Sequence, residues 1–338
     1  MLQDSKKQEL NFDNVRALLA EPRTHLREDF IRSLSDLGLT DIESTGNLHK
    51  VHECLAEGGL DLLICGTILP EGDLHDLIKS VRFGETSTNP FLVIVTLVSN
   101  PTAEVLHKMM DCGPDAILIK PFSPEQLNER ITSLVHNRKR FAVTSDYVGP
   151  ERRKGDREDK TGKETIRVPN PLYIKSFGIE NLAVTRRAAD TATMRINNQM
   201  VESYSQRATD LVEELFPPDG QITWTPERQI PLNELHKVTF ELNKRISGTD
   251  YKPLAGLTST LIRMLKDAGT WTEKTNKGDI RLLRILCEVL QRGFNYTDDP
   301  LLPPPVIEGE PIEASEITDE PENPENNAEN VLELSSSG

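Results

Sequence analysis

The segment Asp61-Leu62-Leu63-Ile64-Cys65-Gly66-Thr67-Ile68-Leu69-Pro70 decides the fold of the first part of the chain. Its apolar run, residues 62–65, is short and uninterrupted, which is typical of a β-strand that is buried on both faces. Gly66 and Pro70 mark the end of the strand and the loop after it. The segment therefore predicts a buried strand that runs out into a loop at Gly66.

Strand-like and helix-like segments alternate on both sides of this stretch. Further apolar runs lie at residues 15–20, 91–96 and 116–122, and amphipathic spacing predicts helices at 26–37, 73–81, 102–112 and from 123 onward. Short connections between alternating strands and helices predict an α/β fold with a doubly wound parallel sheet. Such sheets carry their chemistry at the carboxyl ends of the strands. Four residues fall there: Glu21, Gly66, Thr96 and Lys120.

The order of these segments over residues 14–138 resembles the receiver domain of the response regulators, the CheY-like family of two-component signalling. The resemblance implies a five-stranded, flavodoxin-like parallel sheet. In that family a strand like 62–65 ends in an aspartate, four residues before a loop proline, which accepts a phosphoryl group from a histidine kinase. Counting back from Pro70 leads to Gly66, which has no carboxylate and cannot form an acyl phosphate. The resemblance therefore implies a degenerate pseudo-receiver that lacks its phosphoacceptor.

The other pocket positions of the family are only partly retained. Glu21-Pro22 stands where receivers carry an acidic pair that holds magnesium, so one of the three expected carboxylates remains. Because magnesium prefers several carboxylate and water oxygens, we expect no bound metal and no cofactor. By the same resemblance, Thr96 matches the switch hydroxyl and Lys120 matches the lysine that pairs with phosphate. Ile117 stands at the aromatic switch position.

Each retained position also has a purely structural explanation. Thr96 is a β-branched residue of the kind that is common in strands. Lys120 either pairs with Glu21 or reaches solvent, and we prefer both explanations to phosphate binding. A substitute phosphoacceptor near Gly66 is the least favoured alternative. The candidates for it are Asp61, Thr67, Glu71 and Asp73.

The composition limits the classes of protein that fit. The 338 residues have room for two domains, and the four isolated cysteines argue for a reducing cytoplasm and against a structural zinc site. No apolar run approaches the roughly 20 residues of a membrane span, and no N-terminal signal pattern occurs. The net charge of -15 disfavours general nucleic-acid binding. We expect a soluble cytoplasmic protein that contacts neither a membrane nor nucleic acid.

Residues 139–178 are predicted to form a charged linker. Large apolar residues are scarce here, so the segment is not expected to build a core. It contains the run Tyr147-Val148-Gly149-Pro150-Glu151-Arg152-Arg153-Lys154-Gly155-Asp156-Arg157. One interpretation is a docking segment, with Tyr147 as anchor and the arginines paired with acidic or phosphorylated groups. The other, which we favour, is a solvated linker that its mixed charges keep open.

The longest helical pattern of the chain covers residues 179–216. Apolar residues recur along it at steps of three and four, without an interrupting proline or glycine. The apolar face is narrow and rich in alanine, which suits close contact between helices. We expect it to form a homodimer through residues 179–216, or alternatively to be the core-facing side of a monomeric helical domain.

A helical domain is predicted for residues 179–296, followed by a disordered acidic tail at 297–338. Shorter helices are expected at 232–246, 254–268 and 279–292, with stops at Gly269 and Gly293. Residues 274–277 are expected to be a modestly basic loop. Three prolines, at 303–305, lie near the start of the tail, and every charged residue after them is acidic.

These observations favour a bacterial two-component, or phosphorelay, signal-transduction protein that regulates or scaffolds by protein–protein contact. The expected partners are a histidine kinase, a phosphotransferase or another signalling protein. The sequence contains no P-loop, GxSxG, HExxH or Gly-rich dinucleotide motif, so we do not expect an enzyme. One alternative is a DNA-binding response regulator with a helix-turn-helix within residues 254–292. Another is a structural dimer in which the receiver is passive.

Overall fold

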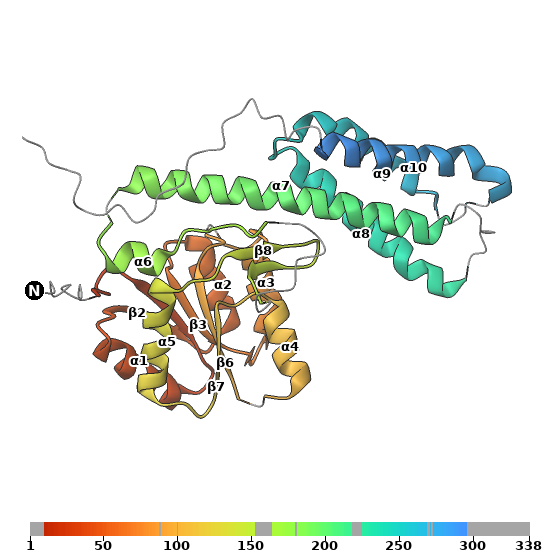
Figure 1. Cartoon of the computed structure of the whole chain (residues 1–338). Coiled ribbons are helices and arrows are strands. Elements are labelled where there is room, and N and C mark those ends of the chain that lie inside the picture. The colour runs from red at the N-terminus through yellow and green to blue at the C-terminus, as the bar shows by residue number, and fades with distance from the viewer. Residues whose placement is uncertain are drawn as a thin grey trace, which may run out of the picture. The chain divides into compact units, whose positions relative to one another are not determined.

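Five parallel strands form the central sheet of the computed structural model, in the order β2-β1-β3-β6-β7 (Figure 1). The strands are β1 (Arg16–Ala20), β2 (Asp41–Thr45), β3 (Leu62–Gly66), β6 (Val93–Val98) and β7 (Ala116–Ile119). This order is that of the flavodoxin-like doubly wound fold. The predicted fold class is thereby confirmed, and β3 ends at Gly66 as expected.

Helices cover both faces of this sheet. One face packs on α1 (Thr24–Asp36) and α5 (Pro124–His136), and the other on α2 (Leu48–Glu57), α3 (Leu74–Arg82) and α4 (Ala103–Asp111). Between β3 and α3, a small hairpin of β4 (Ile68–Leu69) and β5 (Gly72–Asp73) forms the loop that Gly66 opens. Local signals set the helix starts, as at Ser123, whose side chain caps α5 in a capping box with Gln126.

The structure describes residues 10–87, 89–99, 101–152, 164–179, 181–217, 225–268, 271 and 273–295. The predicted acidic tail at 297–338 lies outside the described residues. Among the helices that are described, none is both long enough and apolar enough to cross a membrane.

Residues 138–152 and 164–170, which we call the strap, differ from the open linker that the composition predicts. They contain a hairpin of β8 (Phe141–Val143) and β9 (Val148–Pro150), and Phe141 also forms a β-bridge with Ile166. The strap leads into α6 (Pro171–Ser176). The expectation of an open linker was wrong because the few large apolar residues of the strap pack into a hydrophobic core. Those buried are Phe141, Val143, Val148 and Ile166.

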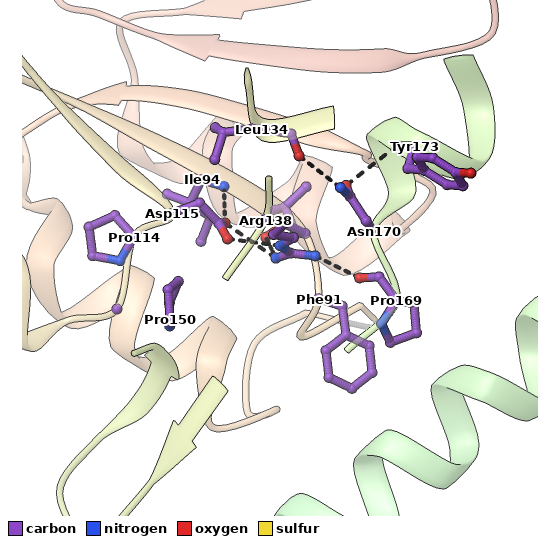
Figure 2. Close-up of polar contacts among 12 residues, drawn as sticks. Phe91, Ile94, Pro114, Asp115, Leu134, Arg138, Pro150, Pro169, Asn170 and Tyr173 are labelled. Atoms are coloured by element: carbon purple, nitrogen blue, oxygen red, sulfur yellow. Dashed lines mark hydrogen bonds and ion pairs between the residues drawn. The ribbon is translucent and has the colours of Figure 1, made fainter. Parts of the chain in front are cut away.

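A buried aspartate fastens the strap to the sheet (Figure 2). Asp115, just before β7, accepts hydrogen bonds from Arg138 Nε at 2.8 Å and from the Ile94 amide at 2.9 Å. Arg138 also donates to the Pro169 carbonyl at 2.6 Å, so one side chain joins both ends of the strap to the amino end of the sheet. Burial would raise the pKa of Asp115, but Arg138 and Arg82 hold that pKa below its ordinary value.

Arg82, the last residue of α3, completes this buried cluster. It donates to Asp115 Oδ2 at 2.8 Å and to the Gly113 carbonyl at 2.7 Å. Burial lowers the pKa of Arg82 to about 10, which still leaves a cation at neutral pH. The guanidinium carbons of Arg82 and Arg138 each lie 5.2 Å from the ring centroid of Phe141. Cation–π attraction thus adds to the ion pairs that hold the strap.

Two glycines allow the strap hairpin to approach the sheet closely. Gly113 has a φ of +86°, and a Cβ there would lie 2.6 Å from the Val148 carbonyl oxygen. A Cβ on Gly149 would lie 2.8 Å from the Gly113 Cα. Tyr147, expected as an anchor for a partner in the docking interpretation, donates its hydroxyl to Pro150 of its own hairpin at 2.7 Å. Residues 153–157 of the same run lie outside the described residues.

The helical region contains α7 (Leu182–Leu215), α8 (Gln229–Ile246), α9 (Ala255–Leu265) and α10 (Glu273–Asn295), with single 3-10 turns at Pro226–Arg228 and Lys252–Leu254. Residues 274–277, expected as a loop, belong to α10. Gly293 does not end this helix, because α10 continues to Asn295. A Cβ on Gly293 would lie 2.8 Å from Leu254 Cδ1, so this glycine lets α10 pack closely on the start of α9.

The apolar face of α7 is covered within the same chain. It belongs to one hydrophobic cluster with residues of α8, α9, α10 and the strap. The predicted helix-contact residues that are buried there are Ala192, Ile196, Met200, Tyr204, Ala208, Leu211 and Leu215. The face on which we expected a homodimer is therefore the core-facing side of this helical region. The helical region also contacts the α/β part of the chain, where Arg245 of α8 donates to the Phe83 carbonyl at 3.1 Å.

Candidate phosphoacceptor pocket

Glu21, Gly66 and Lys120 meet at the carboxyl ends of three neighbouring strands. Glu21 directly follows β1, Gly66 is the last residue of β3, and Lys120 directly follows β7. Lys120 Nζ donates to Glu21 Oε2 at 2.5 Å. Of the explanations considered for Lys120, pairing with Glu21 is the one that this geometry confirms.

The carboxylate of Glu21 is held by cations at both oxygens. Lys120 binds Oε2, and the Nε atom of Arg23 donates to Oε1 at 2.9 Å. Only 1 % of the Glu21 side chain is exposed. This burial would raise the pKa of Glu21, but the hydrogen bonds from Lys120 and Arg23 outweigh it and lower the pKa below its ordinary value. Glu21 is therefore an anion at neutral pH.

Gly66 leaves a space beside this carboxylate. A Cβ built on Gly66 would lie 3.6 Å from Glu21 Oε2 and 3.8 Å from the Ala20 carbonyl oxygen, both ordinary van der Waals distances. An alanine would fit there, but the carboxylate of an aspartate would extend toward the carboxylate of Glu21. The longer arm of Glu21 thus brings an anion next to the position from which the acceptor side chain would project.

The apolar environment of Lys120 strengthens its ion pair with Glu21. The side chain of Lys120 is 13 % exposed, and its Nζ lies 5.8 Å from the ring centroid of Phe30. Phe30 stacks on Phe122, with 5.4 Å between the ring centroids. An apolar, poorly hydrated setting makes the attraction between the two charges stronger than it would be at an open surface.

Thr96 does not join this group. The structure places β6 at Val93–Val98, two residues later than the predicted run, so Thr96 lies inside the strand and not at its end. It is fully buried, and its hydroxyl donates to the Ala116 carbonyl of β7 at 3.4 Å. The residue that directly follows β6 is Ser99, an exposed hydroxyl that the sequence analysis did not consider. The shifted strand boundary is the reason for this difference.

The acids near Gly66 in the sequence have structural partners. Asp61 lies at the opposite, amino end of β3 and accepts from the Arg16 amide at 3.0 Å. Glu71 accepts from the Leu48 amide at 3.1 Å at the start of α2. Asp73 caps α3 through the His75 amide at 2.8 Å and forms an ion pair with Lys108. These contacts do not favour a substitute acceptor among the three.

The described part of the chain contains no cluster of three or more His, Cys, Asp or Glu side chains that could hold a metal ion. At the pocket itself, Pro22 supplies no carboxylate, and both oxygens of Glu21 already accept from Lys120 and Arg23. Magnesium would have to compete with two cations for a single carboxylate. The absence of a magnesium site remains a prediction.

Comparisons with known proteins found sequence similarity to two curated bacterial regulators. No family model matches the chain. The transcriptional regulatory protein CusR of Escherichia coli (strain K12) is 22% identical over 232 residues, which cover 61% of this chain and 100% of CusR. The response regulator MprA of Mycobacterium ulcerans is 29% identical over 126 residues, which cover 37% of this chain and 52% of MprA.

Solved receiver structures are also similar to the first part of the chain. The chemotaxis protein CheY4 of Vibrio cholerae matches with a TM-score of 0.32 and 20% identity, over 35% of this chain and 96% of that one. A signal receiver domain from Clostridium thermocellum matches with a TM-score of 0.33 and 16% identity, over 36% of this chain and 98% of that one. The first part of the chain has the flavodoxin-like, doubly wound fold, with the strand order β2-β1-β3-β6-β7.

Proposed function

We propose that this protein acts in bacterial two-component signalling as a pseudo-receiver, which works by protein–protein contact and without phosphorylation. The observation that carries the proposal is the Glu21–Lys120 ion pair beside Gly66. The acceptor carboxylate is missing, and the lysine that would stabilise a phosphoryl group is neutralised by an acid of the same pocket. The pocket therefore already contains the pair of opposite charges that phosphorylation would otherwise create.

A permanent ion pair favours a single state of the domain. In a switching receiver, the lysine loses or gains a partner as the phosphoryl group comes and goes. Here the partner of Lys120 is part of the chain, so the surfaces of the receiver are set by folding. A ligand that binds two conformations equally well does not change their populations. Control of this domain would therefore come from a partner that binds one conformation of its surface more tightly than another.

The partners that fit this role are a histidine kinase, a phosphotransferase or another signalling protein in the bacterial cytoplasm. We propose that the chain regulates or scaffolds such a partner and is not itself an enzyme. The test is an affinity measurement between the full chain and candidate kinases and phosphotransferases, with and without beryllofluoride and magnesium. We expect the same affinity under both conditions. An affinity that requires the phosphoryl mimic would contradict the proposal.

A DNA-binding response regulator is the second candidate, because the match to CusR extends over the whole length of a protein that is named as a transcriptional regulator. The candidate reading elements are α9 and α10. Fluorescence anisotropy with labelled genomic fragments at moderate salt tests this function. A specific complex whose affinity falls steeply with salt would support it, since phosphate contacts release counterions. No binding beyond that of random DNA would remove it.

A further inference from the structure

A cavity of about 820 Å³ lies at the amino end of the central sheet, at the opposite end of the strands from Gly66. Its floor comes from residues just before β1, β3 and β6. Its walls come from the end of the strap, from α6 and from the first turns of α7. Cavities of this volume accommodate small organic molecules.

The surface that lines this cavity is mainly apolar. Phe91 and Pro169, which Figure 2 shows, belong to it, together with Ile174 of α6. Helix α7 contributes one face, because the residues that it places at the cavity recur at steps of three and four. These residues include Leu182, Thr185, Ala189 and Thr193. The lining therefore suits a ligand with an apolar body.

One acid is buried at the floor of this cavity. Asp61 is 6 % exposed, and within the described residues its carboxyl group accepts one hydrogen bond, from the Arg16 amide to Oδ2 at 3.0 Å. The Arg16 guanidinium is directed elsewhere, 3.6 Å from Glu43 and 3.8 Å from Glu57. Burial raises the pKa of Asp61 above its ordinary value. The ionised carboxyl group is thus short of donors, which a cationic ligand would supply.

The other charges of the cavity lie at its open side. Lys175, Arg186 and Asp190 line the cavity, and all three are exposed. The charge of Lys175 reaches Asp61, but it lowers the pKa of that acid by less than burial raises it. Exposed charges are solvated and contribute little to binding. The buried carboxyl group of Asp61 is therefore the polar group that would select a ligand.

We propose that this cavity binds a small organic ammonium ion with an apolar body. The ammonium group donates to the carboxylate of Asp61, and the body lies against Phe91, Ile174 and Ala189. A hydrogen bond between two charged groups is stronger than one between neutral groups, and the apolar walls remove the body from water. This site is separate from the pocket around Gly66, so the proposal does not depend on the pseudo-receiver function.

Two-dimensional amide NMR of the full chain, titrated with phenethylamine, tests the proposal, because this amine is an ammonium ion at neutral pH. We expect saturable shifts of the Asp61, Phe91 and Ala189 signals, with a dissociation constant on the order of 1 mM. Phenylethanol, a neutral molecule of the same size, should bind at least about tenfold more weakly, because it cannot form the charge-assisted bond. Equal affinity for the two molecules, or no saturable shift up to about 20 mM phenethylamine, would overturn the proposal.

Three variants locate the site. Asp61→Asn keeps an oxygen that can accept from the Arg16 amide, and it should weaken phenethylamine binding at least about tenfold. Asp190→Asn makes the same change on an exposed acid and should alter the affinity by less than about twofold. Ala189→Phe narrows the cavity, leaves Asp61 unchanged and should weaken binding at least about fivefold, which tests the site even if Asp61→Asn does not fold. Unchanged binding by folded Asp61→Asn or by Ala189→Phe, or loss of binding in Asp190→Asn, would overturn the proposal.

Discussion

Lys120 Nζ donates to Glu21 Oε2 at 2.5 Å, and the same oxygen lies 3.6 Å from where a Cβ on Gly66 would stand. Glu21, which follows β1, thus forms an ion pair with Lys120, which follows β7. The pair lies beside Gly66 at the end of β3, where no acceptor carboxylate is present. Gly66 supplies no carboxylate at this position, and the side chain of Glu21 reaches Lys120 instead. The carboxylate of Glu21 in this pocket is thus neutralised by cationic side chains of the same chain.

The ion pair should contribute measurably to stability. Because Glu21 is buried and Lys120 is nearly so, Glu21→Gln leaves a poorly solvated lysine and should cost about 2 kcal/mol of unfolding free energy. Lys120→Met and the double variant complete a cycle, measured by urea unfolding at pH 7. We expect a coupling energy of at least about 1 kcal/mol. Additive single effects would mean that the pair contributes nothing.

The stability that Glu21 provides should depend on pH in the acid range. Its pKa is lowered in the folded protein relative to 4.5, so the unfolded chain binds the proton more readily. The contribution is therefore fully present above pH 4.5 and is lost as the pH falls through the lowered pKa. Unfolding free energies of wild type and Glu21→Gln should therefore converge as the pH falls below 4.5 and through this lowered pKa. A difference that begins to shrink already above pH 4.5 would contradict the assignment.

The strap should depend on Arg138 much more than on its exposed neighbour. Arg138→Met removes one of the two guanidinium groups that hold buried Asp115 and should destabilise the chain by about 3 kcal/mol. Arg140→Met makes the same chemical change two residues away on an exposed side chain and should cost less than about 0.5 kcal/mol. Limited proteolysis should cut within the strap of the Arg138 variant first. Equal destabilisation by the two substitutions would contradict the role assigned to Arg138.

The Gly113–Gly149 contact should tolerate no side chain. Gly113→Ala combines a left-handed backbone with a Cβ 2.6 Å from the Val148 carbonyl oxygen, so it should destabilise by at least about 3 kcal/mol. Gly84→Ala is the matched control, because Gly84 has a φ of +70° with nothing within 4 Å of a Cβ. Gly84→Ala should lower the unfolding free energy by about 1 kcal/mol, because it introduces only the backbone strain of a left-handed residue. Thermal unfolding of both variants therefore separates this strain from the steric clash at Gly113.

The sequence predicted the α/β fold of the first part of the chain well because its signals are local. The apolar run before Gly66 and the capping serine at residue 123 both correspond to elements at those places. Glu21 and Lys120 could be placed at one sheet edge from strand alternation alone. Thr96 was misplaced because the apolar run from Phe91 to Val98 is continuous and does not show where β6 begins.

The strap could not be predicted because its contacts join residues far apart in the chain. Composition alone made residues 139–178 look open, whereas Arg138 finds Asp115 and Phe141 finds two guanidinium groups only in the folded protein. The same limit applies to α7, since periodicity identifies an apolar face but not whether the same chain or another copy covers it. Only the three-dimensional arrangement showed that the same chain covers the apolar face of α7.

The central claim is that this receiver takes no phosphoryl group. Two-dimensional amide NMR of the full chain, titrated with magnesium and beryllofluoride, tests it directly. The full chain is needed because a cut near residue 140 would remove the strap contacts of Arg138. The control is the triple variant Gly66→Asp, Glu21→Asp, Pro22→Asp, which restores all three acids and frees Lys120. We predict that the wild type does not respond and that the triple variant does. Saturable shifts of the wild-type signals around Gly66 and Lys120 would contradict the account.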